Sequence, residues 1–538
     1  MLGTQVAADL EVATLQICCK TSWGHKTFQT GLANVTSDRK EIKQKQLPLL
    51  ALRRNVALRN KVCDALAALP PLTDKVDKCL STTASDNLEA ESIQQILWNP
   101  TSHVSFLNTQ GTFLNAVATW KTLLVPAFAI LMPILTLIVP YFLLRFLHKD
   151  MSVSVYMGHL RRILLQQITM PALLRARGEN DVIGYTLETA FLLFTVGMFL
   201  SGIWNQISAA LHLRKIWDML EEQGGAVLQT IEVGRRVLTA TAAGLRGGLR
   251  RLLAEGETVV GDCERRLGGC GGVAAFGAVW NGGPTAAAVG RLKDWLGRVD
   301  VLCTLAGLED AICVPRLAAA ATAPLRIRGV YHPRVADCIP NDYGAAGADG
   351  SHVLLTGPNR GGKSTYCKSV GLAILTAQSW GFAWARAMTW SPFGAVLTAL
   401  ESNGQLGFNS TFEAEIEFAK SVLERQERPL YVMMDEIFHS TNAIDGVAAS
   451  KVFLDRLYVL PGVQSLLSTH YRELAETYSK NGLARTQQMV ASEGADGVLT
   501  YAYTVADGVS DKSSVMEILR EKGLLCGDKT AAESAEKH

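Results

Sequence analysis

The stretch that most constrains the fold of this chain is VLLTGPNRGGKST, residues 353–365. Its first four residues are apolar or β-branched, as in a buried strand, and the residues from Ser364 to about Trp380 have the apolar spacing of a helix. Between them, Gly357, Gly361 and Gly362 let the backbone wrap closely around an anion. The stretch therefore predicts a strand, a phosphate loop and a helix.

The chemistry expected of this loop depends on its geometry. Backbone N–H groups and the positive end of the next helix converge on one point, where an anion binds. At the spacing G-x-x-x-x-G-K-S, Lys363 reaches the terminal phosphates of a nucleotide and the Ser364 hydroxyl ligates Mg²⁺. The alternative is a glycine-rich turn that binds nothing. The other loop residues expected at the nucleotide are Gly357, Pro358, Asn359, Gly361, Gly362 and Thr365.

Two further strand ends carry polar groups that a nucleotide enzyme needs. The segment LYVMMDE, residues 430–436, indicates a strand that ends in two acids. Asp435 would hold Mg²⁺ and Glu436 would orient or deprotonate the attacking water. Another strand, residues 463–468, is followed closely by His470. Ligands of such sheets bind at the carboxyl ends of the strands, so His470 is expected beside the γ-phosphate, with a capping or core histidine as the alternative.

Five motifs in this part of the chain resemble, in order and at similar spacing, the ATPase domain of the MutS family. The resemblance covers roughly residues 326–515. It implies an α/β P-loop NTPase domain of the ABC/MutS type, with ATP and Mg²⁺ as cofactors and ATP hydrolysis as the activity. The motifs are TGPNRGGKSTY (356–366), FNSTFEAEI (408–416), MMDEIFHSTNAIDG (433–446), STHYREL (468–474) and DGVSDKS (507–513).

The resemblance also implies roles for single residues. Lys363, Ser364 and Asn359 would contact the phosphates and Mg²⁺, Asp435 would be the acid on the Mg²⁺ side, and Glu436 would be the catalytic base. The groups that act in catalysis would thus be Glu436, His470 and Lys363.

Four further residues take their implied roles from the same family pattern. Ser410, with Thr411, would complete the nucleotide site of a partner subunit across a dimer. Asp445 would lie at the junction of the two subunits, and His470 would act as a switch. His332, in the segment Tyr331-His332-Pro333, would pack on the adenine base. A homodimer formed through the ATPase domains is therefore expected.

Three departures from the family pattern bear on function. Phe438, His439 and Ser440 stand where the family more often has Gly-Arg-Gly, which alters the loop after Glu436. Only 24 residues follow Ser514, so we expect the family's C-terminal helical dimer element to be short or missing. The Phe-x-Glu triplet that wedges into mismatched DNA occurs nowhere in the chain. DNA binding is thus implied by the resemblance alone.

Composition sets wider limits. A chain of 538 residues allows two to four domains. Its formal charge of +2 gives no strong bias toward nucleic acid, so a DNA contact would have to be local. The 11 cysteines form no C-x-x-C pair, which favours a reducing compartment and indicates no zinc site.

The residues before the ATPase motifs are mainly helical in pattern. Residues 43–69 have apolar positions at helical spacing and stop at Pro70-Pro71, which predicts an amphipathic helix or a helix pair. This segment weakly resembles the start of the helical core of MutS proteins, and a generic helical module explains it equally well. Residues 235–253 form a basic helical face for DNA or acidic lipid, or simply a solvated helix. The Gly- and Ala-rich residues 268–290 predict a flexible bend.

One uncharged run is long enough to cross a membrane. Residues 122–144 comprise 23 residues without a charge, and as a helix they would extend about 34 Å, against about 30 Å for a hydrocarbon core. Lys121 precedes the run and Arg145 follows it. Its three prolines, seven residues apart, are better tolerated in a membrane helix than in water. A buried core helix is the alternative.

A second crossing is expected at residues 189–213, although its most apolar portion, 190–204, spans only 15 residues. An interfacial or buried helix would explain it as well. Two crossings would return the chain to the side that contains ATP. The loop between them would then be more basic than an outside loop should be, and a single crossing or a re-entrant hairpin would remove this conflict. The basic residues concerned are Arg145, Lys149, Arg161, Arg162, Arg175 and Arg177.

Together these patterns predict an α/β P-loop NTPase domain preceded by an all-α helical core that transmembrane helices interrupt. The expected parts are residues 1–118 (helical), 119–214 (membrane), 215–325 (helical connector) and 326–538 (ATPase). The expected protein is a membrane-anchored, divergent MutS-family ATPase without the mismatch-recognition domain, with its ATPase on the cytosolic side. Its expected partners are ATP, membrane lipid, a second copy of the chain and, by resemblance, mismatched or branched DNA.

Two other functions remain open. An ATP-driven membrane tether or scaffold would use the same motor without processing DNA. An ABC-type transporter ATPase would share the phosphate loop and the paired acids, but it needs LSGGQ where this chain has FNSTFEAEI, residues 408–416.

Overall fold

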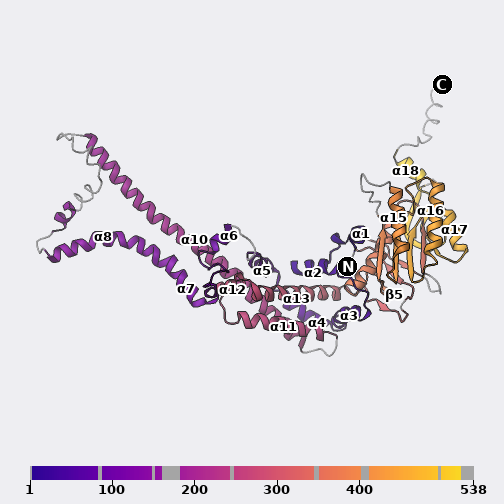
Figure 1. Ribbon diagram of the computed structural model, residues 1–538, viewed down its shortest axis with the longest axis horizontal. Coiled ribbons are helices and arrows are strands. Elements are labelled where there is room, and N and C mark those ends of the chain that lie inside the picture. Colours follow the sequence, from indigo (N-terminus) through magenta and orange to yellow (C-terminus); the bar gives the residue numbers. More distant parts are fainter. Residues whose placement is uncertain are drawn as a thin grey trace, which may run out of the picture. The chain divides into compact units, whose positions relative to one another are not determined.

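The structure is a computed structural model that describes residues 3–82, 88–147, 152–159, 182–242, 248–320, 322–344, 351–400, 411–494 and 498–522. The chain divides into two compact units (Figure 1). The first comprises Met1–Pro70, Arg236–Glu257 and Lys293–His538, and the second comprises Pro71–Arg235 and Thr258–Leu292. The division into residues 1–118, 119–214, 215–325 and 326–538 stays a prediction.

The first unit contains a six-stranded sheet in the order β10-β9-β4-β8-β7-β6. All neighbouring strands are parallel except β9 and β10, which form an antiparallel hairpin. The three central strands β4, β8 and β7 are buried throughout, as expected for parallel strands covered on both faces. The strands are β4 (His352–Thr356), β6 (Ala395–Ala399), β7 (Leu430–Met434), β8 (Val463–Ser468), β9 (Arg485–Glu493) and β10 (Leu499–Asp507).

A smaller sheet in the same unit has the order β1-β5-β2-β3. One face of it is buried through Ile327, Met388 and Trp390, and the other exposes Arg326 and Arg328, so the strands alternate as expected for a half-solvated sheet. Its strands are β1 (Arg316–Leu317), β2 (Arg326–Val330), β3 (Asn341–Tyr343) and β5 (Ala387–Trp390). The first unit thus has the mixed α/β character that the sequence predicts.

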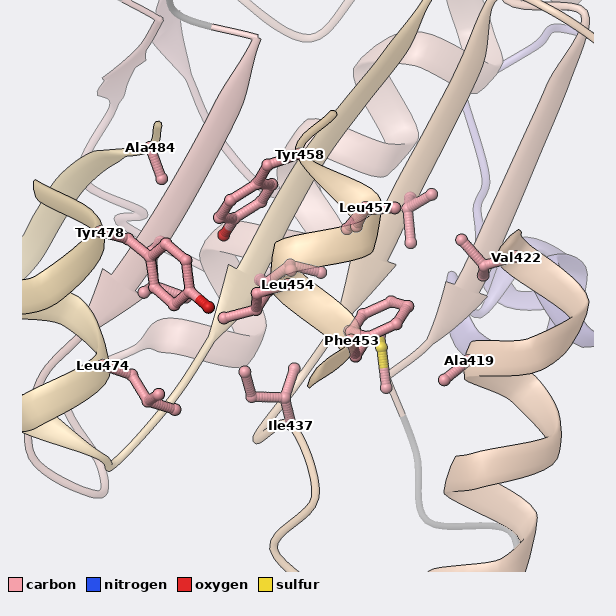
Figure 2. Packing of buried hydrophobic residues seen from close by; sticks show 14 of the residues in the cluster. Ala419, Val422, Ile437, Phe453, Leu454, Leu457, Tyr458, Leu474, Tyr478 and Ala484 are labelled. Atoms are coloured by element: carbon pink, nitrogen blue, oxygen red, sulfur yellow. The ribbon is translucent and has the colours of Figure 1, made fainter. Parts of the chain in front are cut away.

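Helices α15, α16 and α17 pack on the large sheet through a shared core (Figure 2). Figure 2 shows Leu454 and Leu457 of α16 between Leu474 of α17 and Val422 of α15. Helix α14 begins within the phosphate loop and is almost wholly buried. The helices that follow the strands are α14 (Lys363–Ser379), α15 (Thr411–Glu424), α16 (Ala443–Leu457), α17 (Arg472–Lys480) and α18 (Val515–Glu521).

The N-terminal segment also belongs to this α/β unit. Helix α1 (Thr4–Asp9) contacts β6, and the buried Asp9 accepts a hydrogen bond from Leu400 N at 3.2 Å. Beyond the short helix η1 (Val12–Thr14), the chain leads into the helical part of the unit. Residues 3–14 therefore support the edge strand of the sheet, which the sequence did not indicate.

The helical residues of the first unit follow the predicted pattern with one correction. Residues 39–66 form a pair of helices, α3 (Arg39–Arg54) and α4 (Val56–Leu66), separated by Asn55, whose side chain caps α4. The pair ends before Pro70, but Pro70 itself starts α5 (Pro70–Thr82), because proline fits the first position of a helix. Helix α2 (Ser22–Leu32) precedes this pair.

Long helices account for most of the remaining chain. These are α10 (Val182–Ala242), α11 (Arg250–Leu267) and α13 (Gly283–Gly307), with the shorter elements α6 (Leu88–Ile93), η2 (Ser105–Thr109), α7 (Gly111–Thr119), η3 (Trp120–Leu124), α8 (Val125–Leu147) and α12 (Gly272–Trp280). The helical character predicted for the part before the ATPase motifs is thus confirmed.

The flexible bend predicted at residues 268–290 is wrong, because part of it forms the buried helix α12. Its glycines allow very close packing within the second unit. A Cβ on Gly224 of α10 would lie 1.8 Å from Gly272 O, and one on Gly277 would lie 2.2 Å from Asn108 O. In the sequence these small residues suggest a loop, but in the structure they permit backbone contact between helices.

Within the described residues, one helical stretch, Gly111–Leu147, is long and apolar enough to cross a membrane, judged by length and composition only. It includes α8, which stays helical through Pro126, Pro133 and Pro140 and exposes large apolar side chains such as Phe146. The second expected crossing, 189–213, lies within α10 and stays a prediction. Of the basic residues expected in the loop between the crossings, Lys149, Arg161, Arg162, Arg175 and Arg177 lie outside the described residues.

The core beneath α16 yields a stability prediction. Leu454 is fully buried, so Leu454→Ala should lower the free energy of unfolding by about 2–5 kcal/mol through lost burial and a residual cavity. Val452 on the same helix is 64% exposed, and Val452→Ala should change the free energy of unfolding by less than about 0.5 kcal/mol. Urea unfolding followed by tryptophan fluorescence measures both, and equal effects would contradict the packing in Figure 2.

Candidate functional site

The loop between β4 and α14 has the backbone of an anion cradle. Gly357 and Gly362 adopt φ values of +151° and +95°, which side-chain-bearing residues rarely adopt. A Cβ on Gly357 would also lie 2.9 Å from Met489 Cβ. Both glycines are therefore required by conformation, and the first N–H groups of α14 lie at the end of the loop.

Lys363 lies buried inside this loop. Its Nζ atom donates to Gly357 O at 3.1 Å and to Pro358 O at 3.3 Å, so the ammonium lies within the cradle. Burial lowers the pKa of Lys363, and the negative charges of Glu436 and Asp435 oppose that shift. A phosphate entering the cradle would offer the ammonium stronger, charged acceptors than the two carbonyls.

The carboxylate of Asp435 is held by two hydroxyls. Ser364 Oγ donates to one of its oxygens and Ser468 Oγ to the other. Ser468 Oγ also accepts from Glu436 N at 2.7 Å, so one hydroxyl fixes both acids at the end of β7. The described residues contain no group of three or more His, Cys, Asp or Glu that could hold a metal by themselves.

The residues present nevertheless fit a nucleotide-bound Mg²⁺. This ion usually takes only one or two protein oxygens and completes its shell with phosphates and water. Ser364 Oγ and an oxygen of Asp435 already lie within hydrogen-bonding distance of one another. Two hard oxygen ligands are therefore adjacent at the edge of the cradle.

Glu436 faces His470 across the ends of β7 and β8. His470 Nε2 lies 2.6 Å from Glu436 Oε1, and this hydrogen bond is the largest cause of the lowered pKa of Glu436, against which burial acts. The residue adopts a φ of +56°, an uncommon conformation for a glutamate. The carboxylate is therefore held ionised and oriented beside the cradle.

Lys363, Ser364 and Glu436 border a cavity of about 570 Å³, and Asp435 and Glu436 line a second cavity of about 730 Å³. Exposed apolar side chains of Val335, Ile339 and Tyr503 form part of the wall of the first cavity, as expected for a surface that takes a flat base. Of the predicted residues, the first cavity is lined by Pro358, Asn359, Gly362, Lys363, Ser364, Thr365 and Glu436.

Other predicted residues lie apart from this cavity. His332 is buried, its burial lowers its pKa, and it is not among the lining residues, so its contact with a base stays a prediction. Asp445 is exposed in the first turn of α16 and bonds to Asn442. Ser410 lies outside the described residues, and Thr411 is the first residue of α15.

Two contributors were not singled out from the sequence. Ser468 was only the last residue of a predicted strand, although a hydroxyl at the carboxyl end of a strand beside two acids was a usable signal. Met489 packs against the loop glycines from β9. Nothing local in the sequence marks that contact, because it depends on the parallel pairing of β9 with β4.

The basic helical face at residues 235–253 is partly neutralised. In the second unit Arg235 pairs with Glu264 at 2.7 Å, and the neighbouring Asp262 pairs with Arg266 and Arg291. In the first unit Arg298 pairs with Glu255. Of these charged residues only Arg235 belongs to residues 235–253, so the choice between a solvated helix and a surface for DNA or acidic lipid stays open.

Residues 353–528 match the family model described as MutS domain V. The DNA mismatch repair protein MutS of Pelotomaculum thermopropionicum is 29% identical over 187 residues, 35% of this chain and 21% of that protein. The DNA mismatch repair protein MSH3 of Coccidioides immitis is 31% identical over 238 residues, 42% of this chain and 21% of that protein.

A third DNA mismatch repair protein is similar over a comparable part of the chain. The DNA mismatch repair protein Msh6 of Gallus gallus is 31% identical over 253 residues, 41% of this chain and 19% of that protein. The chain thus spans about a fifth of the length of these relatives. The similarity covers the segment that contains the cradle, the two acids and the histidine.

The Ser468 hydroxyl, which bonds to both Asp435 and Glu436, can be tested by substitution. Ser468→Ala removes the acceptor of Glu436 N and a donor to Asp435, and an unpaired buried polar group costs about 1–3 kcal/mol. The free energy of unfolding in urea should fall by that amount. Ser421→Ala, on the exposed side of α15, should leave it within about 0.5 kcal/mol of wild type. If both variants behave alike, Ser468 does not fix the acids.

Proposed function

We propose that this chain, a member of the MutS family, is an ATPase whose catalytic site is the cavity between the loop at residues 357–362 and the ends of β7 and β8. One observation carries the proposal: Lys363 and Glu436 line one cavity together with Ser364, Ser364 bonds to the carboxylate of Asp435, and Glu436 pairs with His470. Charge stabilisation and a positioned base are what phosphoryl transfer to water requires.

The residues divide the chemistry between them. The N–H groups of the loop and Lys363 bind the phosphates and offset the charge that develops on them. Ser364 and Asp435 would hold Mg²⁺, which would neutralise phosphate charge. His470 occupies Glu436 Oε1 at 2.6 Å, which leaves Oε2 to accept the proton of the attacking water.

The proposal extends to the assembly and to its membrane, which the family resemblance and the apolar helix support. Ser410 would complete the site of a second copy, so two chains close on two nucleotides. The stretch Gly111–Leu147 anchors the chain in a membrane, with the ATPase on the cytosolic side. Closure of the two ATPase domains on their nucleotides would then move the helical residues 215–325 and the membrane segment. The whole chain would act on mismatched or branched DNA, as the names of its relatives suggest.

A second function has its own support. An exposed apolar helix favours an ATP-driven membrane tether that does not process DNA. The two functions share the ATPase and differ in the response to DNA.

Replacing Glu436, the proposed catalytic base, tests whether the chain hydrolyses ATP by this mechanism. Glu436→Gln removes the proton acceptor while keeping the shape of the side chain, so ATP turnover should fall at least about 100-fold. Binding of a fluorescent ATP analogue should persist, because the cradle and Lys363 are unchanged. Glu476→Gln, at an exposed ion pair with Arg472 on α17, is the matched control and should turn over ATP like wild type. Undiminished hydrolysis by Glu436→Gln would refute the assigned base.

The effect of DNA on ATP turnover distinguishes the DNA-processing ATPase from the membrane tether. ATP turnover by the detergent-purified full chain is measured alone and with homoduplex, mismatched and branched DNA. The DNA-processing function predicts that mismatched or branched DNA raises the turnover, because closure and DNA binding are coupled. An unchanged rate with every DNA would favour the tether.

A further inference from the structure

The turn that presents Glu436 is strained and has unusual support. Glu436 and Phe438 both adopt left-handed conformations, with φ values of +56° and +47°. Such conformations cost free energy in residues with side chains and persist only where neighbouring groups hold them. Ser468 accepts from Glu436 N, and Tyr471 donates its hydroxyl to Phe438 O at 2.9 Å. These two contacts hold the side of the turn next to β8.

The other side of the turn is held by α15. His439 Nδ1 lies 2.8 Å from the carbonyl oxygen of Glu436 and 3.0 Å from Glu415 Oε1. Ser440 Oγ donates to the same Glu415 oxygen at 2.7 Å. Both neighbours of His439 Nδ1 are acceptors, so this nitrogen carries the proton. The Nδ1–H group of His439 thus connects the backbone carbonyl of Glu436 to the carboxylate of Glu415 on α15.

Apolar contacts run alongside this bridge. The ring of Phe412 in the first turn of α15 packs edge-on against Phe438, with 6.2 Å between the centroids. Phe438 in turn packs edge-on against Phe453 of α16 at 5.9 Å. The strained turn is therefore fastened to two helices, and only the His439 bridge reaches the Glu436 carbonyl among the contacts of the described residues.

We propose that His439 and Glu415 are positioning residues that fix the backbone of Glu436, and through it the direction of its carboxylate. Ser440 helps to hold Glu415 in place. This inference rests on the proposed ATPase function. None of the three residues lies in the wall of the cavity at the phosphate loop. They line the second cavity, which Asp435 and Glu436 also border, and His439 reaches Glu436 through its backbone carbonyl.

Two substitutions of one residue test the bridge. In His439→Asn the side-chain N–H lies close to the position of Nδ1, so the donor to the Glu436 carbonyl is kept. In His439→Gln the amide extends toward the position of Nε2, so the donor is lost. We expect His439→Gln to lower kcat about tenfold to 100-fold with KM unchanged, because a displaced catalytic group affects the transition state alone. His439→Asn should retain most of the wild-type kcat.

A double-mutant cycle tests the partner. Glu415→Ala should lower kcat as His439→Gln does, and the two changes together should be no worse than either one, because both remove one bridge. Glu424→Gln, at the exposed end of the same helix, should leave kcat unchanged. Circular dichroism and thermal melting of each full-length variant exclude unfolding as the cause.

The outcomes separate this inference from the function on which it rests. If wild type hydrolyses ATP and Glu436→Gln does not, equal rates for His439→Gln, His439→Asn and wild type overturn the bridge alone. A parallel loss of kcat in both His439 variants also overturns it, because the donor would then be irrelevant. If wild type hydrolyses no ATP, the proposed function fails and the inference fails with it.

Discussion

The parallel register of three buried strands determines where every group of the candidate site lies. Leu355 of β4 pairs with Ser468 of β8, and Leu467 of β8 pairs with Met434 of β7. Each strand therefore ends at the same level, and the residues that follow meet at one edge of the sheet. A shift of this register by one residue would turn each buried side chain to the opposite face, which the two-sided core of the sheet opposes.

Much of this arrangement could be predicted because its signals are local. A strand, a glycine loop and a lysine in thirteen consecutive residues define a cradle, and two acids after a second apolar strand place a second group at the same edge. The support of that edge could not be predicted, because Ser468, Met489 and His439 contact residues of other strands and helices. Helix α12 was missed for a related reason: its glycines serve helix packing, and only the neighbouring backbone distinguishes that role from a bend.

Strain is concentrated at the proposed base. In the family pattern a glycine often follows at the position of Phe438, and a glycine would adopt its φ of +47° without cost. Here a phenylalanine occupies this conformation and packs between Phe412 and Phe453. The aromatic contacts offset backbone strain and join the turn to helices that a glycine could not reach.

The contact between Asp9 and Leu400 joins positions 391 residues apart in the sequence. A ribosome makes helix α1 long before β6, the strand on which it rests. The hydrogen bond between the Asp9 carboxylate and Leu400 N cannot form before that strand has been synthesised, and contacts of such high sequence separation are the kind that slow folding.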